Sequence, residues 1–102
     1  MNQRISHILL PALVLAAAGL AGSAGANDLR GPLLAGNCYG CHGPNGDSRG
    51  SIPPLSGLDA GEIAQAMLDF RAGNRKSTVM QRQARGYSEE EIAIIAQNIA
   101  QN

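Results

Sequence analysis

The chain of 102 residues has room for one small domain, with 44% hydrophobic and 16% charged residues. Its formal charge is zero at pH 7, which argues against a nucleic-acid partner held by bulk positive charge. Only two cysteines and two histidines are present, which excludes metal sites that need many such ligands.

The N-terminal residues have the three parts of a secretory signal. The first seven residues are polar with one positive charge, residues 8–20 are almost continuously apolar, and a small Ala-Gly-Ala sequence ends at Ala26. The apolar run is shorter than the roughly 20 residues that a retained membrane anchor needs. We therefore expect a signal peptide over residues 1–26, cleaved after Ala26, and a mature domain over residues 27–102 in the periplasm without a membrane span.

Two helices are predicted in the first part of the mature chain. Residues 29–38 have leucines at helical spacing, with Pro32 acceptable only in the first turn. After a loop rich in glycine and proline, Asp59 and Glu62 form a capping box at which the second helix begins. Gly73 is a natural stop for this helix.

A third helix is predicted at the C-terminus, after a polar loop over residues 74–87. Ser88 and Glu91 form a second capping box. The apolar positions that follow have helical spacing: Ile92, Ile95, Ala96 and Ile99. Because no segment alternates like a half-buried strand, the expected fold is all-α, with about three helices around one flat cofactor.

The segment Cys38–His42 has the pattern C-x-x-C-H. A Cys38–Cys41 disulfide would close too short a loop to stabilise the domain, and a structural zinc needs four ligands. The pattern is typical of covalent attachment of c-type haem, one per chain here. Two cysteines three positions apart can each form a thioether, and the adjacent His42 can bind the iron.

The second axial ligand of the iron must come from another residue type, because His42 is the only histidine after the signal. Met80, in the loop before the last helix, is the favoured ligand, and Met67 on the middle helix is expected to pack against the haem. His/Met ligation raises the reduction potential, suits electron transfer and leaves no open axial position.

The axial histidine also needs a partner for its other ring nitrogen. The Pro53 carbonyl is the expected acceptor, with Ile52 and Leu55 packing beside the haem. The alternative is that the prolines of this loop only stiffen it.

Five basic residues and no acidic residue occur between positions 71 and 85. They could steer an acidic partner to the haem, neutralise the haem propionates, or form a solvated loop. The sequence leaves these alternatives open. The residues are Arg71, Arg75, Lys76, Arg82 and Arg85.

The mature chain as a whole resembles the small class I cytochromes c, in its haem motif, its proline-leucine-glycine loop, its methionine loop and its last helix. Four segments resemble more narrowly the single-haem cytochrome subunit of flavocytochrome c sulfide dehydrogenase: residues 52–57, 69–75, 77–82 and 86–91. Several members of that family carry two haem domains, whereas this chain has one haem motif and no internal repeat.

The resemblance implies an electron-transfer haem subunit. An FAD-containing subunit would oxidise sulfide and pass electrons to this chain, which would pass them to a downstream acceptor protein. We expect no catalytic residues here, because neither the cysteines nor the histidine remain free for sulfur chemistry. A free periplasmic single-haem carrier is the alternative function, and a gas-binding haem module would require that Met80 is not a ligand.

Overall fold

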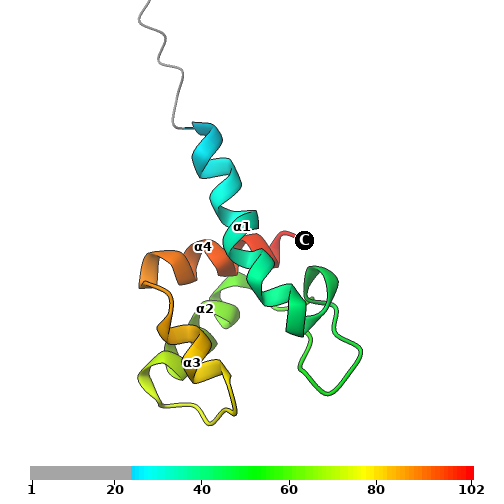
Figure 1. The fold of residues 1–102 in the computed structure, drawn as a ribbon, viewed down its shortest axis with the longest axis vertical. Coiled ribbons are helices and arrows are strands. Elements are labelled where there is room, and N and C mark those ends of the chain that lie inside the picture. Colours follow the sequence, from blue (N-terminus) through cyan, green and yellow to red (C-terminus); the bar gives the residue numbers. More distant parts are fainter. Residues whose placement is uncertain (1–23) are drawn as a thin grey trace, which may run out of the picture.

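Helices make up most of residues 24–102, the part of the chain that the computed structural model describes (Figure 1). No strand occurs among these residues, as expected for an all-α fold. The expected signal peptide lies outside the described residues except for its last three positions, so its cleavage stays a prediction. Within the described part, no helix combines the length and the hydropathy needed to cross a bilayer. The elements in chain order are α1 (Ala24–His42), the short 3-10 helix η1 (Pro44–Gly46), α2 (Ala60–Ala72), α3 (Met80–Arg85) and α4 (Glu89–Ala100).

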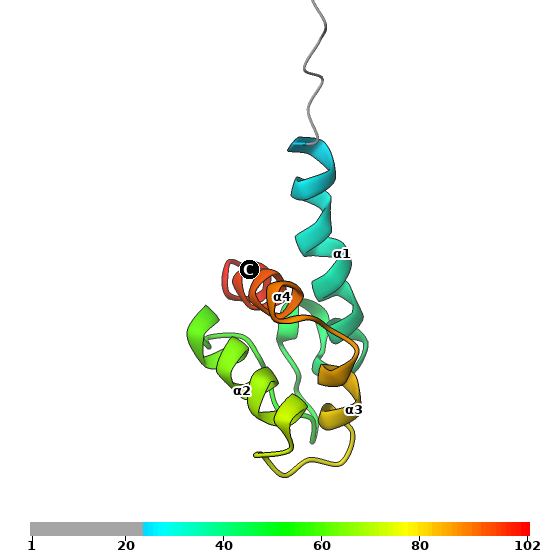
Figure 2. The same cartoon turned by 90° about the vertical axis from the view of Figure 1, so that its left-hand side faces the viewer.

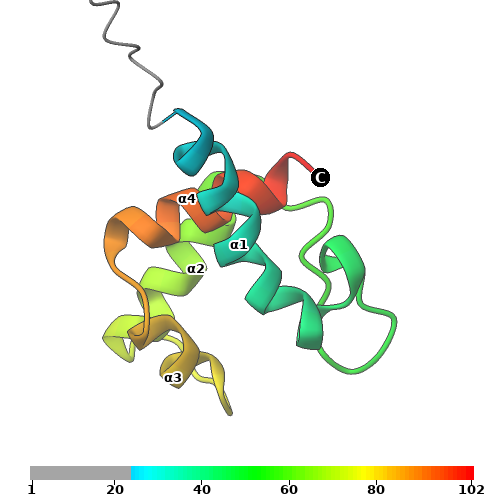
Figure 3. The same ribbon diagram turned by 45° about the horizontal axis from the view of Figure 1, so that its top comes forward.

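The last helix, α4, is the centre of the packing. It packs against both α1 and α2, while α3 packs against α2 (Figures 2 and 3). The largest fully buried side chains are three isoleucines of α4, Ile92, Ile95 and Ile99, which confirms the predicted apolar stripe. They contact Ala35, Ile63 and Met67 in a single core cluster. A core of so few large side chains is small for an independent domain, which is the situation in which a bound cofactor commonly completes the core.

Both predicted capping boxes are present. The Asp59 carboxylate accepts from the Glu62 backbone N–H at 2.8 Å, and the Glu62 carboxylate accepts from the Asp59 N–H at 3.0 Å. Ser88 and Glu91 repeat the arrangement at 3.1 and 2.9 Å at the start of α4. The reciprocal bonds satisfy backbone donors that a helix start otherwise leaves unpaired, so the two helix starts were predictable from local sequence alone.

The first helix is longer than predicted. It begins at Ala24 and continues to His42, so Pro32 lies in its interior and the expected start near residue 29 is wrong. A proline removes one intrahelical hydrogen bond but leaves the rest of the ladder, and the residues after it are held by packing on α4.

Two of the three leucines of α1 do not lie on its buried face, while the third, Leu34, is half-buried and packs against the core cluster. Leu29 and Leu33 are 62% and 71% exposed, whereas the small residues Gly31 and Ala35 are buried. Small side chains allow the α1 and α4 backbones to approach closely, and Leu34 packs beside this crossing against the core cluster.

The predicted loop over residues 74–87 contains a helix, α3, and in this respect the prediction is wrong. The run from Met80 to Arg85 consists of strong helix formers. Before it, the Ser77 hydroxyl accepts from the Gln81 N–H at 3.0 Å. Met80 is therefore the first residue of a short helix and not part of an irregular loop.

Candidate functional site

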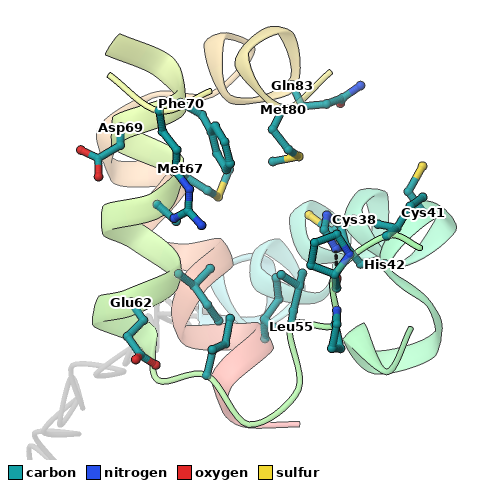
Figure 4. A pocket seen from close by; sticks show the side chains of 18 of the residues that line it. Cys38, Cys41, His42, Leu55, Glu62, Met67, Asp69, Phe70, Met80 and Gln83 are labelled. Atoms are coloured by element: carbon teal, nitrogen blue, oxygen red, sulfur yellow. Dashed lines mark hydrogen bonds between the residues drawn. The ribbon is translucent and has the colours of Figure 1, made fainter. Parts of the chain in front are cut away.

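A cavity of about 990 Å³ lies between the end of α1, the loop over residues 51–58, α2 and the start of α3 (Figure 4). Its volume is at the upper end of the roughly 300–1,000 Å³ range of ligand pockets. All the site residues predicted from the sequence line this cavity: Cys38, Cys41, His42, Ile52, Pro53, Leu55, Met67 and Met80. Segments distant in the sequence thus converge on one site.

The two cysteines lie on the last turns of α1 and are not joined by a disulfide. Cys38 is half-buried against the core, whereas Cys41 is exposed. Burial raises the pKa of the Cys38 thiol, because apolar surroundings disfavour the thiolate. Residues three positions apart lie on neighbouring turns of one helix face, and both cysteines line the cavity.

The His42 imidazole has a defined orientation. Its Nδ1 lies 2.6 Å from the carbonyl oxygen of Pro53, so the expected hydrogen bond is present. Because a proline carbonyl can only accept, Nδ1 carries the proton and Nε2 keeps its lone pair. A neutral imidazole with a free Nε2 is the form that binds a metal ion.

The loop that carries Pro53 is held by Gly46. The Gly46 carbonyl accepts from the backbone N–H groups of Leu55 and Ser56 at 2.7 and 3.1 Å. Gly46 is buried, has a φ of 77°, and lies so close to Leu55 that an added Cβ would be 2.9 Å from the Leu55 Cβ. The loop therefore returns along the end of α1, which places the Pro53 carbonyl beside the histidine.

Two methionines line the cavity on the wall that lies opposite the end of α1. Met80 extends into it from the start of α3, and Met67 extends from α2 (Figure 4). Met67 is 6% exposed and belongs to the core cluster, while Met80 is half-buried and lies outside that cluster. This difference agrees with packing for Met67 and leaves the Met80 thioether available to a ligand.

The cavity residues fit a covalently bound haem. Two thiols, a free imidazole nitrogen and a thioether are the groups that c-type attachment and axial ligation require. Among the described residues, no three His, Cys, Asp or Glu side chains are grouped as a metal site. His42 and Met80 are the cavity residues whose side chains could bind a haem iron.

Several cavity residues were not predicted from the sequence. Phe70 and Ile63 continue the apolar face of α2 on which Met67 lies, and their spacing was the signal that could have identified them. Arg75 also lines the cavity, with its guanidinium carbon 4.9 Å from the Phe70 ring centroid. In the sequence it is one of five basic residues, and nothing local distinguishes it from the others.

Comparison with known proteins identifies the family to which the chain is similar. The model of the family described as Cytochrome c matches residues 29–101. The cytochrome subunit of sulfide dehydrogenase from Chlorobaculum tepidum is 47% identical over 68 residues, which cover 67% of this chain and 62% of the relative.

Two other relatives differ in how much of their length is matched. The thiosulfate dehydrogenase electron acceptor of Stutzerimonas stutzeri is 38% identical over 61 residues, 58% of this chain and 28% of the relative. Cytochrome c-553 of Desulfomicrobium norvegicum is 29% identical over 75 residues, 71% of this chain and 94% of the relative. The chain thus covers less than two thirds of the two dehydrogenase-associated relatives and nearly all of the small cytochrome.

Proposed function

The chain belongs to the cytochrome c family, and we propose that it is the haem subunit that accepts electrons from an FAD-containing flavoprotein oxidising sulfide in the periplasm. It carries covalently bound haem c and serves in electron transfer. The observation that supports a sulfide-oxidising flavoprotein as the electron donor is the 47% identity to a protein named as the cytochrome subunit of sulfide dehydrogenase. The name of a second relative also refers to a dehydrogenase of an inorganic sulfur compound.

In this proposal each site residue predicted from the sequence has a defined task. Cys38 and Cys41 form the thioethers, and His42 and Met80 are the axial ligands. Pro53 orients His42, while Ile52, Leu55 and Met67 provide the apolar contacts of the pocket. Haem iron supplies one-electron transfer between its ferrous and ferric states.

The chain's residues keep the geometry of the site constant during electron transfer. The bond to Pro53 fixes the imidazole, and the start of α3 fixes the Met80 backbone. If His42 and Met80 both bind the iron, no coordination position would be left for a substrate. The task that remains is to accept an electron and pass it to an acceptor protein.

A free periplasmic electron carrier is the second candidate. It is favoured by the 94% coverage of a relative that is named as a cytochrome c-553 and not as a subunit of a dehydrogenase. The two functions differ in the contact they need. A stable subunit buries a large, partly apolar interface, whereas a carrier docks weakly through a small one.

Native purification of the holoprotein from a periplasmic fraction tests the proposal. We expect a flavin-containing protein to co-elute and sulfide to reduce the haem of that complex rapidly. The control is sulfide added to the cytochrome alone, which measures direct reduction. If the cytochrome elutes alone and purified flavoprotein does not accelerate its reduction, the free-carrier function replaces the proposed one. The mass of the same sample should equal residues 27–102 plus one haem, which tests the signal cleavage.

A further inference from the structure

We propose that Arg75 binds a propionate group of the haem and thereby contributes to the reduction potential of the iron. This inference rests on the covalent haem and is independent of the identity of the dehydrogenase. Haem carries two propionate carboxylates, on pyrrole rings other than the two that receive the cysteine thioethers. A cavity built to hold haem must therefore also accommodate anions away from Cys38 and Cys41.

Arg75 is the one lysine or arginine among the residues that line the cavity in the described part of the chain. The other basic residues between positions 71 and 85 do not line it. Two carboxylates, Glu62 and Asp69, lie on the α2 wall, and Asp69 already accepts a hydrogen bond from Gln65 at 3.0 Å. Because like charges repel, the propionates are expected to avoid the α2 carboxylates and to lie next to Arg75.

The Arg75 guanidinium is held at the cavity wall by Phe70. The guanidinium carbon lies 4.9 Å from the ring centroid, within the range of a cation–π contact, and both residues line the cavity. A cation–π contact does not use the N–H groups as donors to a carboxylate, so these remain available to an anion. These N–H groups match the two oxygens of a carboxylate.

Arg75 has no carboxylate partner among the described residues. The ion pairs found there join Arg30 to Glu90 and Arg49 to Asp47. An arginine that is positioned at the cavity by an aromatic ring, and is not paired with a protein carboxylate, is suited to bind an anion supplied by the cofactor.

Replacement of Arg75 tests this assignment in the isolated holocytochrome, without any partner protein. A positive charge next to the haem disfavours ferric iron, so Arg75→Gln should lower the midpoint potential in an optical redox titration. The matched control is Arg85→Gln, which removes the same charge from an arginine of α3 that is exposed like Arg75 but does not line the cavity. The absorption spectrum of each variant verifies that the axial ligands are unchanged.

Salt distinguishes a direct ion pair from a distant charge. Exposed charges are largely screened beyond about 10 Å at 0.1 M ionic strength, whereas pairs in contact are screened much less. We expect the Arg75→Gln shift to persist at high salt, the Arg85→Gln shift to vanish there, and Arg75→Lys to restore most of the potential at low salt. An Arg75→Gln shift that is no larger than that of the control, or that disappears with salt, would overturn the assignment.

If Arg75→Gln does not mature into holoprotein, the salt dependence of the midpoint potential of Arg75→Lys tests the assignment instead. Lysine keeps the charge but lacks the planar group that stacks on Phe70. A potential more salt-sensitive than that of the wild type supports the ion pair, and an unchanged salt response contradicts it. Sulfide reduction is not measured in these experiments, so failure of this inference is separate from failure of the proposed electron donor.

Discussion

The imidazole Nδ1 of His42 lies 2.6 Å from the carbonyl oxygen of Pro53, which comes 11 residues later in the chain. This contact joins the last residue of α1 to the loop that precedes α2. It leaves Nε2 as the acceptor nitrogen of a residue that lines the cavity. The orientation of the expected axial ligand therefore depends on how the loop returns to α1, and not on the haem motif alone.

Replacing Met80 with alanine should open one axial position of the iron. We expect Met80→Ala to bind small ligands such as imidazole and to have a lower midpoint potential, because the thioether stabilises ferrous iron. Optical redox and ligand titrations measure both effects. Met67→Ala is the control, because it removes the other thioether of the cavity. Equal ligand binding by the two variants would contradict the assignment of Met80.

Replacing Cys41 should prevent normal haem retention. We expect Cys41→Ala to lose most of its haem under denaturing conditions and to fold poorly, since the cofactor completes a small core. Haem-stained gels and circular dichroism measure the two outcomes. The exposed Arg49→Gln, from the neighbouring loop, should retain haem. A well-folded, haem-free Cys41→Ala protein would show that the haem is not needed for folding.

A side chain at Gly46 should disturb the loop that carries Pro53. Gly46→Ala adds a Cβ 2.9 Å from the Leu55 Cβ at a residue with a φ of 77°. We expect a loss of stability of about 1–3 kcal/mol from backbone strain, increased by the clash. Denaturant unfolding of the holoprotein measures it.

Gly57→Ala is the matched control for Gly46→Ala. Gly57 has a φ of 84°, but no atom lies within 4 Å of its added Cβ. It should therefore show the backbone strain without the clash. If the two variants lose the same stability, the contact with Leu55 is not what constrains the loop.

The capping box of α4 should make stability depend on acid pH. The hydrogen bond from the Ser88 backbone N–H is the main cause that lowers the pKa of Glu91 in the folded protein. A carboxylate with a lowered pKa contributes stability that is fully present above its unfolded pKa, about 4.3, and is lost as the pH falls through the folded value.

Substitution of Glu91 checks this pH dependence. The free energy of unfolding of Glu91→Gln should fall less than that of the wild type as the pH is lowered through that acid window. That of Glu89→Gln, which lies in the same helical turn but outside the box, should fall as much as that of the wild type. Ser88→Ala should cost about 1 kcal/mol at neutral pH through loss of the N-cap. Unfolding curves between pH 3 and 7, roughly the range around that pKa, measure these effects. If the stability of Glu91→Gln depends on pH in the same way as that of the wild type, the Glu91 carboxylate is not the source of the pH dependence.

Local sequence was sufficient to predict the elements whose ends depend on nearby residues. The capping boxes at Asp59 and Ser88 specify the starts of α2 and α4, because each pairs its own backbone donors within four residues. The haem motif was equally local, because its thiols and imidazole occupy two turns of one helix. Helix α3 was missed because the polar residues around it lack apolar periodicity, although the run from Met80 to Arg85 favours a helix.

The sequence by itself determined the type of cofactor, the all-α class and the side chains that were candidates to hold the haem. Only the tertiary structure decided that Gly31 and Ala35 rather than Leu29 form the buried face of α1, and that Arg75 alone of the basic residues between positions 71 and 85 lines the cavity. These features depend on how closely α1 and α4 approach and on where the chain returns after α2. Such distances arise from packing between segments far apart in the chain, which residue spacing does not encode.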